Sequence, residues 1–233
     1  MIIEQPPRIY RWLFPGVFWR IPAPEGTPKS VYLTFDDGPI PEMTPWILET
    51  LDKYNIKATF FCVGENVQHY PALYNLLLEK GHRVGNHTFN HIQGIGRQSK
   101  KYIRNVAEAA KYIESDLFRP PHGHMRLPQL LRLRKLFRII MWDVVTRDYS
   151  PYLTAQGVLN IVKKLPATAQ SSFFMTHLKL LDASKRPYRK LLNGCCKRVI
   201  NFVFPISLSL PPALCKLTPS IPNNERLSQS TWR

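Results

Sequence analysis

The 233-residue chain is predicted to be an α/β protein built on a parallel sheet, either open or closed into a barrel. The first reason is that apolar, β-branched segments alternate with helix-like segments from residue 31 to about residue 164. The second is that carboxylate and imidazole side chains follow several of these apolar segments. The hydrophobic content of 44% is typical of a globular domain with a real core and argues against a disordered chain.

The first predicted strand covers residues 31–35 (VYLTF) and is stopped by Gly38-Pro39. A helix is expected from Thr44, because Pro45 suits the first helical position. The same alternation predicts strands at 56–63, 82–87, 117–121 and 138–145, and helices near 71–80, 99–115, 127–136 and 154–164.

Polar side chains mark the ends of four predicted strands, in the order Asp36 and Asp37, His87, Arg119, then Asp143 and Asp148. Because the carboxyl ends of parallel strands meet at one edge, this convergence predicts an active site there. Asp143 is interpreted as an ordinary strand-end residue, and Cys62 as a small buried hydrophobe. His69 and His82 are expected at the surface near helix ends.

The segment HTFNH places His87 and His91 four residues apart. On a helical turn this spacing puts both imidazoles on one face, where they can share a metal ion. A carboxylate from another strand end would complete a two-His-one-carboxylate site, which leaves positions open for water and substrate. The adjacent Asp36 and Asp37 could supply it, whereas a solvated turn is the simpler interpretation of that pair alone.

Four segments then resemble, in order, the successive motifs of the NodB-type polysaccharide deacetylases, carbohydrate esterase family 4. These are TFDDGP (34–39), HTFNH (87–91), RPPHG (119–123) and WDVVTRDY (142–149). The resemblance covers about residues 29–164 and implies a distorted (β/α) barrel of the NodB-homology type. It also implies a metal-dependent hydrolase that removes acetyl groups, mainly N-acetyl, from a polysaccharide or an amino-sugar oligomer.

The resemblance implies a role for each matching residue. Asp37, His87 and His91 would hold a divalent ion, expected to be zinc, and Asp36 would be the general base that deprotonates the attacking water. Arg119 would pair with the base and hold it ionised, Asp148 would tune the catalytic acid, and Thr88 would orient the loop between the histidines. Tyr149, Pro121 and His122 are expected at the substrate groove, although His122 is equally interpreted as an exposed loop histidine.

The catalytic acid of the family is a histidine after a late apolar strand, and this chain departs from that pattern. His177 follows Met175-Thr176 and is not followed by Asp or Ser, so the acid is missing or displaced. If codons 170–176 are read from their third bases, an apolar run, His or Tyr, and then Asp become available. A second late motif of the family returns at 195–202 in the same frame. A frameshift near Lys163-Lys164 is therefore predicted.

The formal net charge of +16 is concentrated late in the chain, since residues 165–233 hold ten Lys/Arg against two Asp/Glu. This basic tail is interpreted as an out-of-frame product, so no nucleic-acid partner is predicted, and a polyanion-binding arm is the alternative. Two functions remain open: a working deacetylase, or an inactive remnant that binds metal and carbohydrate without the acid.

Residues 1–28 form an aromatic and basic extension in which the apolar run is short and broken by Pro15. The extension matches neither a signal peptide nor a membrane-spanning helix. Packing on the domain is expected, with peripheral contact to a membrane surface as the alternative. The compartment and the oligomeric state are left open.

Overall fold

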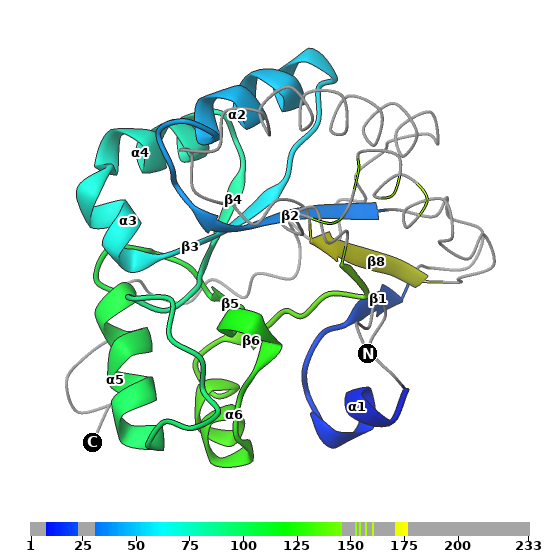
Figure 1. Ribbon diagram of the computed structural model, residues 1–233, viewed down its shortest axis with the longest axis vertical. Helices are drawn as coiled ribbons and strands as arrows, with labels where there is room; N and C mark the ends of the chain where they lie inside the picture. Colours follow the sequence, from blue (N-terminus) through cyan, green and yellow to red (C-terminus); the bar gives the residue numbers. More distant parts are fainter. Residues whose placement is uncertain are drawn as a thin grey trace.

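The computed structural model describes residues 8–22, 31–145, 152, 154, 157, 160 and 171–176. Its elements are α1 (Arg8–Leu13), β1 (Arg20–Pro22), β2 (Val31–Gly38), α2 (Thr44–Lys53), β3 (Thr59–Cys62), α3 (Gly64–His69), α4 (Pro71–Glu79), β4 (Arg83–Asn86), α5 (Ser99–Ala109), β5 (Leu117–Phe118), a 3-10 turn (Pro121–Gly123), α6 (Leu127–Leu133), β6 (Arg138–Ile139), β7 (Val144–Val145) and β8 (Ser171–Thr176). Figure 1 shows the helices on the outside of the sheet. The predicted α/β class is confirmed.

The sheet runs in the order β1-β8-β2-β3-β4-β5-β6, with β7 beside β8. All of these pairings are parallel except β1 with β8. Next to β1, the Phe18 amide donates to the Ile139 carbonyl at 2.9 Å, and the Met141 amide donates to the Phe18 carbonyl at 2.8 Å. The segment 18–22 therefore joins both edges of the sheet and closes it into a distorted barrel.

The described part of the N-terminal extension, residues 8–22, packs on the domain, as expected. Trp19 is buried, and Phe14 and Val17 pack against the core cluster beneath α5 and α6. The buried Asp143 carboxylate forms ion pairs with Arg11 and with Arg20, the latter at 2.7 Å. Asp143, interpreted from the sequence as an ordinary strand-end residue, is thus the anchor of the barrel-closing segment.

The helices form because apolar residues recur on one face of each. In α5 the buried residues Tyr102, Ile103, Val106 and Ala109 follow the helical period, while Lys and Arg occupy the solvent side. Burying each of the larger side chains contributes about 1.5–3 kcal/mol. No described helix combines the length and the apolar character needed to cross a lipid bilayer.

Several predicted boundaries differ from the structure. Helix α5 ends at Ala109, earlier than predicted, and the strand predicted at 138–145 is interrupted between β6 and β7. Helix α3 was not predicted. Most of the helix predicted at 154–164 lies outside the described residues. Within the predicted basic tail, β8 lies between β1 and β2, while the reading frame of the tail stays a prediction.

His82 is buried rather than at the surface, with 4% of its area exposed. Its Nδ1 accepts a hydrogen bond from the Ala58 amide at 3.2 Å, and its ring meets Phe60 edge-on. Burial, together with the charges of Lys57 and Lys80 and against that of Asp52, lowers the pKa of His82 to about 4. The folded protein therefore holds this imidazole neutral in mildly acidic solution.

We expect the free energy of unfolding to fall as the pH drops from about 6.5 towards 4, because only the unfolded chain protonates His82 in that range. The loss attributable to His82 at pH 5 should be about 2 kcal/mol. Urea unfolding at pH 7 and pH 5 measures it. The variant His82→Gln, which cannot titrate, should lose less stability over this range than the unmodified chain. An equal loss in both would contradict the assignment.

Candidate metal and catalytic centre

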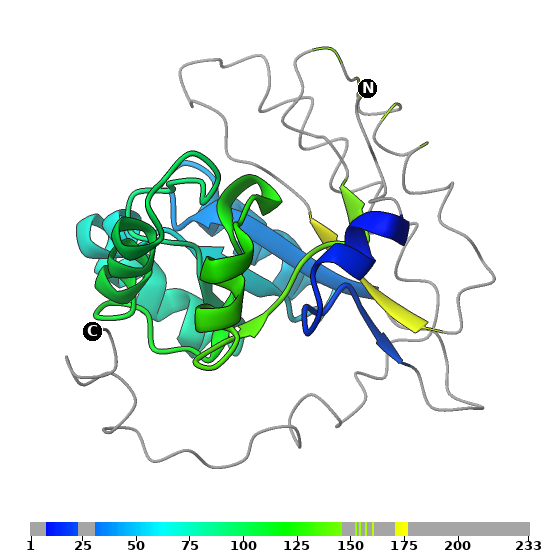
Figure 2. The ribbon, with the colours of Figure 1, turned by 90° about the horizontal axis from the view of Figure 1, so that it is seen from below.

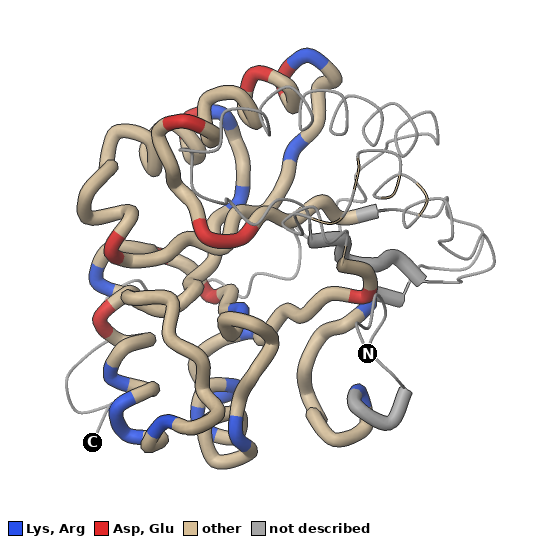
Figure 3. The backbone as a smooth tube through the Cα atoms, viewed as in Figure 1, with Lys and Arg blue, Asp and Glu red and all other residues tan. Residues whose placement is uncertain are grey.

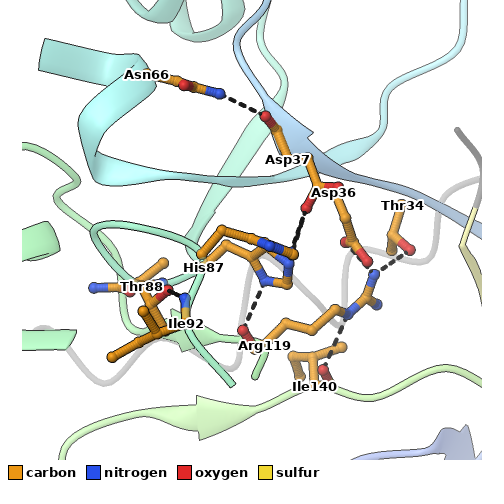
Figure 4. A network of polar contacts seen from close by, with 11 residues as sticks. Thr34, Asp36, Asp37, Asn66, His87, Thr88, Ile92, Arg119 and Ile140 are labelled. Atoms are coloured by element: carbon orange, nitrogen blue, oxygen red, sulfur yellow. Dashed lines mark hydrogen bonds and ion pairs between the residues drawn. The ribbon is translucent and has the colours of Figure 1, made fainter. Parts of the chain in front are cut away.

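The site lies where β2, β4 and β5 end. Asp36 and Asp37 are near the carboxyl end of β2, His87 directly follows β4, and Arg119 directly follows β5. The parallel pairing of β2 with β3, β3 with β4 and β4 with β5 brings these strand ends to one edge. Figure 4 shows the side chains converging there.

An irregularity in β2 explains how two adjacent carboxylates both serve this edge. Successive residues of a regular strand point to opposite faces. The register of β2 with β3 shifts between Asp36 and Gly38, and Asp37 adopts a left-handed backbone with φ of 68°. This bulge breaks the alternation, so Asp36 reaches Arg119 while Asp37 reaches the histidines.

Asp37, His87 and His91 form a group that could hold a metal ion. Asp37 Oδ1 lies 3.3 Å from His87 Nε2 and 2.9 Å from His91 Nε2. The three ligand atoms all lie within 4.8 Å of one another. Within the described ranges, it is the one cluster of His, Cys, Asp and Glu side chains whose ligand atoms lie this close together.

The contact made by His87 Nδ1 shows that this nitrogen of the ring carries a proton. Nδ1 lies 2.8 Å from the Arg119 carbonyl oxygen, which can only accept, so Nδ1 carries the proton. In the neutral tautomer of His87, the lone pair of Nε2 therefore faces Asp37. Within the described part of the chain, the buried Asp37 Oδ1 and His91 Nε2 atoms also make no hydrogen bond. Electron-pair donors that face one another without a shared proton fit a divalent cation.

The charge of Asp37 agrees with this fit. Burial alone would raise the pKa of Asp37, but the adjacent imidazoles of His87 and His91 outweigh burial and lower that pKa well below its usual value. Asp37 is therefore an anion at neutral pH. Two imidazoles and one carboxylate make a donor set suited to zinc and related divalent ions.

Residues 87–91 form a loop and not the helical turn by which the spacing of the two histidines was interpreted. Thr88 and His91 have left-handed φ angles of 66° and 53°. The Thr88 amide donates to Asn86 Oδ1 at 2.9 Å, and Thr88 Oγ1 accepts from the Ile92 amide at 3.1 Å, as Figure 4 shows for the second bond. Hydrogen bonding by short polar side chains thus replaces the helix and still brings both imidazoles together.

Two further asparagines support the ligands, and both were missed from the sequence. Asn66 of α3 donates to the Asp37 carbonyl oxygen at 2.8 Å. Asn105 of α5 accepts from the Phe89 and Asn90 amides at 2.9 and 3.2 Å. Asparagine is unfavourable inside helices unless its amide has a specific partner, and that signal could have identified these positions.

Arg119 is fully buried and holds Asp36 in place. Its Nη1 donates to Asp36 Oδ1 and to Thr34 Oγ1, both at 2.7 Å. Nε and Nη2 donate to the carbonyls of Ile140 and Met141 at 3.2 Å, and the guanidinium lies 4.1 Å from the centre of the Phe61 ring. Burial lowers the pKa of Arg119, Asp36 opposes that shift, and the guanidinium stays charged.

The structure describes two of the residues expected at the substrate groove, Pro121 and His122. Pro121 is buried, whereas His122 is exposed with φ of 57°. The His122 ring lies 4.9 Å from the His91 ring, centre to centre, so it borders the metal group. Asp148, Tyr149 and His177 lie outside the described residues.

The chain is similar in sequence to known deacetylases. The polysaccharide deacetylase family model matches residues 23–137. The chain is 39% identical over 114 residues to a peptidoglycan-N-acetylglucosamine deacetylase of Bacillus cereus, covering 47% of this chain and 52% of that protein. It is 31% identical over 158 residues to a chitooligosaccharide deacetylase of Azorhizobium caulinodans, covering 64% and 73%.

Peptidoglycan deacetylase PdaC from Bacillus subtilis has a similar structure, with a TM-score of 0.64 and 26% identity over 76% of this chain and 84% of that one. The chain spans about half the length of the Bacillus cereus relative and about three quarters of the Azorhizobium one. The motifs, the fold and these matches together show that the chain belongs to the polysaccharide deacetylase family.

Proposed function

We propose that the chain is a metal-dependent hydrolase that removes N-acetyl groups from an amino-sugar polymer or oligomer. The observation that carries this proposal is the convergence of Asp37, His87 and His91 beside the buried Asp36–Arg119 pair. Two relatives are named for peptidoglycan N-acetylglucosamine and for chitooligosaccharide, and these supply the substrate class.

Asp37, His87 and His91 would hold the ion, and zinc is the metal we propose. When bound, such an ion polarises a carbonyl group and lowers the pKa of water towards about 7. Asp36 then serves as the base that takes the proton of the attacking water. Arg119 orients Asp36 through the 2.7 Å contact between Nη1 and Oδ1.

Roles are also proposed for the other residues of the four motifs. Thr88 holds the loop between the two histidines through its bond to the Ile92 amide. His122 and Pro121 border the place where a sugar would approach the metal group, supported by the contact of His122 with His91. Tyr149 as a groove wall and Asp148 as the residue that tunes the acid rest on motif position alone.

The variant His87→Ala should lose both metal and activity, because it removes one ligand and the hydrogen bond that fixes its orientation. We expect metal affinity to fall by more than about 100-fold, beyond the loss typical of supporting residues. Metal content by mass spectrometry and acetate release from N-acetylglucosamine oligomers and peptidoglycan measure the two effects. His69→Ala, an exposed histidine at the end of α3, is the matched control. Normal metal content and acetate release in His87→Ala would overturn the proposal.

A further inference from the structure

Large apolar side chains are exposed on two helices that the proposed reaction does not use. In α1, Trp12 and Leu13 are 79% and 54% exposed. In α6, Leu127 and Leu131 are 52% and 39% exposed, and their spacing of four residues puts them on one side of the helix. Single exposed apolar residues are ordinary, but four on two neighbouring helices mark a candidate interaction surface.

Helices α1 and α6 are neighbours in the fold. The turn after α1 packs through Phe14 and Val17 against the core cluster to which Leu130 and Leu133 of α6 also belong. Gly16 in the same turn faces the Arg134 side chain. Figure 2, which views the molecule from below, shows α1 and α6 side by side toward the viewer. We call the surface they share the α1–α6 face.

The α1–α6 face is also strongly basic. Its exposed cations, all in or next to α6, are Arg126, Arg132, Arg134 and Lys135. The sequence contains no acidic residue from 117 to 142. Lys and Arg of α5, which contacts α6, extend the positive charge along the same lower edge, as Figure 3 shows.

Charge and apolar exposure together indicate the partner. A soluble polyanion binds through cations and gains little from the exposed leucines of the two helices. A bilayer surface with anionic headgroups uses both, because Trp and Leu enter the interface while Lys and Arg stay at the phosphates. The ion pairs of Arg11 and Arg20 with Asp143 hold α1 against the barrel, so the two helices present a fixed surface.

We propose that the α1–α6 face docks the protein on the surface of a membrane that contains anionic lipids. The docking is independent of the metal group, which uses Asp37 of β2 and the two histidines of the loop after β4. It would hold the domain at a lipid surface while leaving its chemistry unchanged.

Vesicle co-sedimentation of the full chain tests this docking. The probes are vesicles of phosphatidylcholine alone and vesicles with about 30% phosphatidylglycerol, where the cations should favour the second. Trp12→Ser with Leu13→Ser, and separately Leu127→Gln with Leu131→Gln, should each weaken binding about ten-fold. Arg134→Gln with Lys135→Gln should weaken binding to the anionic vesicles by about five-fold per charge.

Leu78→Gln is the matched control, because Leu78 is 46% exposed on α4, away from the α1–α6 face. The basic residues of 165–233 remain in every variant, so differences between variants isolate the face. All variants should release acetate from a soluble oligomer at the rate of the unmodified chain.

Three results would overturn the proposal. One is absence of binding to the anionic vesicles. Another is equal binding by the unmodified chain and both apolar variants, which would indicate attraction through charge alone. The third is a loss of vesicle binding in Leu78→Gln that equals the loss in the two apolar variants of the face. If one apolar pair disturbs folding, judged by circular dichroism, the other pair on the other helix decides.

Discussion

Replacing Asp36 by Asn should abolish deacetylation while leaving the metal in place. Asn has nearly the same shape and can still accept the hydrogen bond from Arg119, but it cannot take a proton from water. The loss of a general base should lower kcat by about 10²–10⁴. Metal content should be unchanged, because the ligands are Asp37, His87 and His91.

Acetate release and metal content of Asp36→Asn are measured on the same preparation. Asp52→Asn is the control, since Asp52 is a surface carboxylate near the end of α2 that pairs with Lys80 and not with any residue of the site. Full activity in Asp36→Asn would refute the base assignment. Loss of metal together with activity would show that Asp36 is a ligand instead.

Arg119→Gln should destabilise the protein more than any surface substitution. It leaves the Asp36 carboxylate, whose side chain is 9% exposed, without its buried cation. Breaking a buried ion pair by removing one partner costs about 3–5 kcal/mol, and the carbonyls of Ile140 and Met141 would also lose their donors. Activity should fall with it, because Asp36 loses the contact that orients it.

Urea unfolding measures the free energy, and a double-mutant cycle separates the pair from its surroundings. Arg119→Gln combined with Asp36→Asn should be less destabilised than the sum of the two single variants, because no buried charge is left alone. Arg83→Gln, which loses an exposed ion pair with Asp116, should cost about 1 kcal/mol or less. Strict additivity of the Arg119 and Asp36 effects would contradict the coupling.

The parts of the fold that the sequence predicted are those that local chemistry determines. Strand β2 follows from its β-branched residues, and α2 begins at Thr44 because Pro45 suits the first turn. The edge at which Asp36, Asp37, His87 and Arg119 meet follows from parallel pairing. These predictions need no knowledge of contacts between distant residues.

The remaining features depend on such distant contacts. The loop at 87–91 owes its left-handed angles to Asn86 and Asn105, and a spacing rule for helices cannot anticipate them. Barrel closure by Phe18 and the anchoring of Arg11 on Asp143 join residues more than a hundred positions apart. His82 was predicted exposed because its packing on Phe60 is likewise invisible in sequence.

The predicted frameshift near Lys163-Lys164 concerns residues that are mostly outside the described ranges. Strand β8 is the part of that region with a described backbone, and its Thr176 lies opposite Thr34 of β2. Sequencing of the gene across codons 155–205, with an intact mass of the product, tests the frame directly. It also decides whether an apolar-His-Asp segment is encoded there.

The central claim is that Asp37, His87 and His91 hold an ion on which hydrolysis depends. Acetate release from an N-acetylglucosamine oligomer, measured on the full chain before chelation, after chelation and after addition of zinc, tests it most directly. We expect about one metal ion per chain, loss of activity on chelation, and its return as zinc refills the site. Acetate release that is the same with and without metal would contradict the claim.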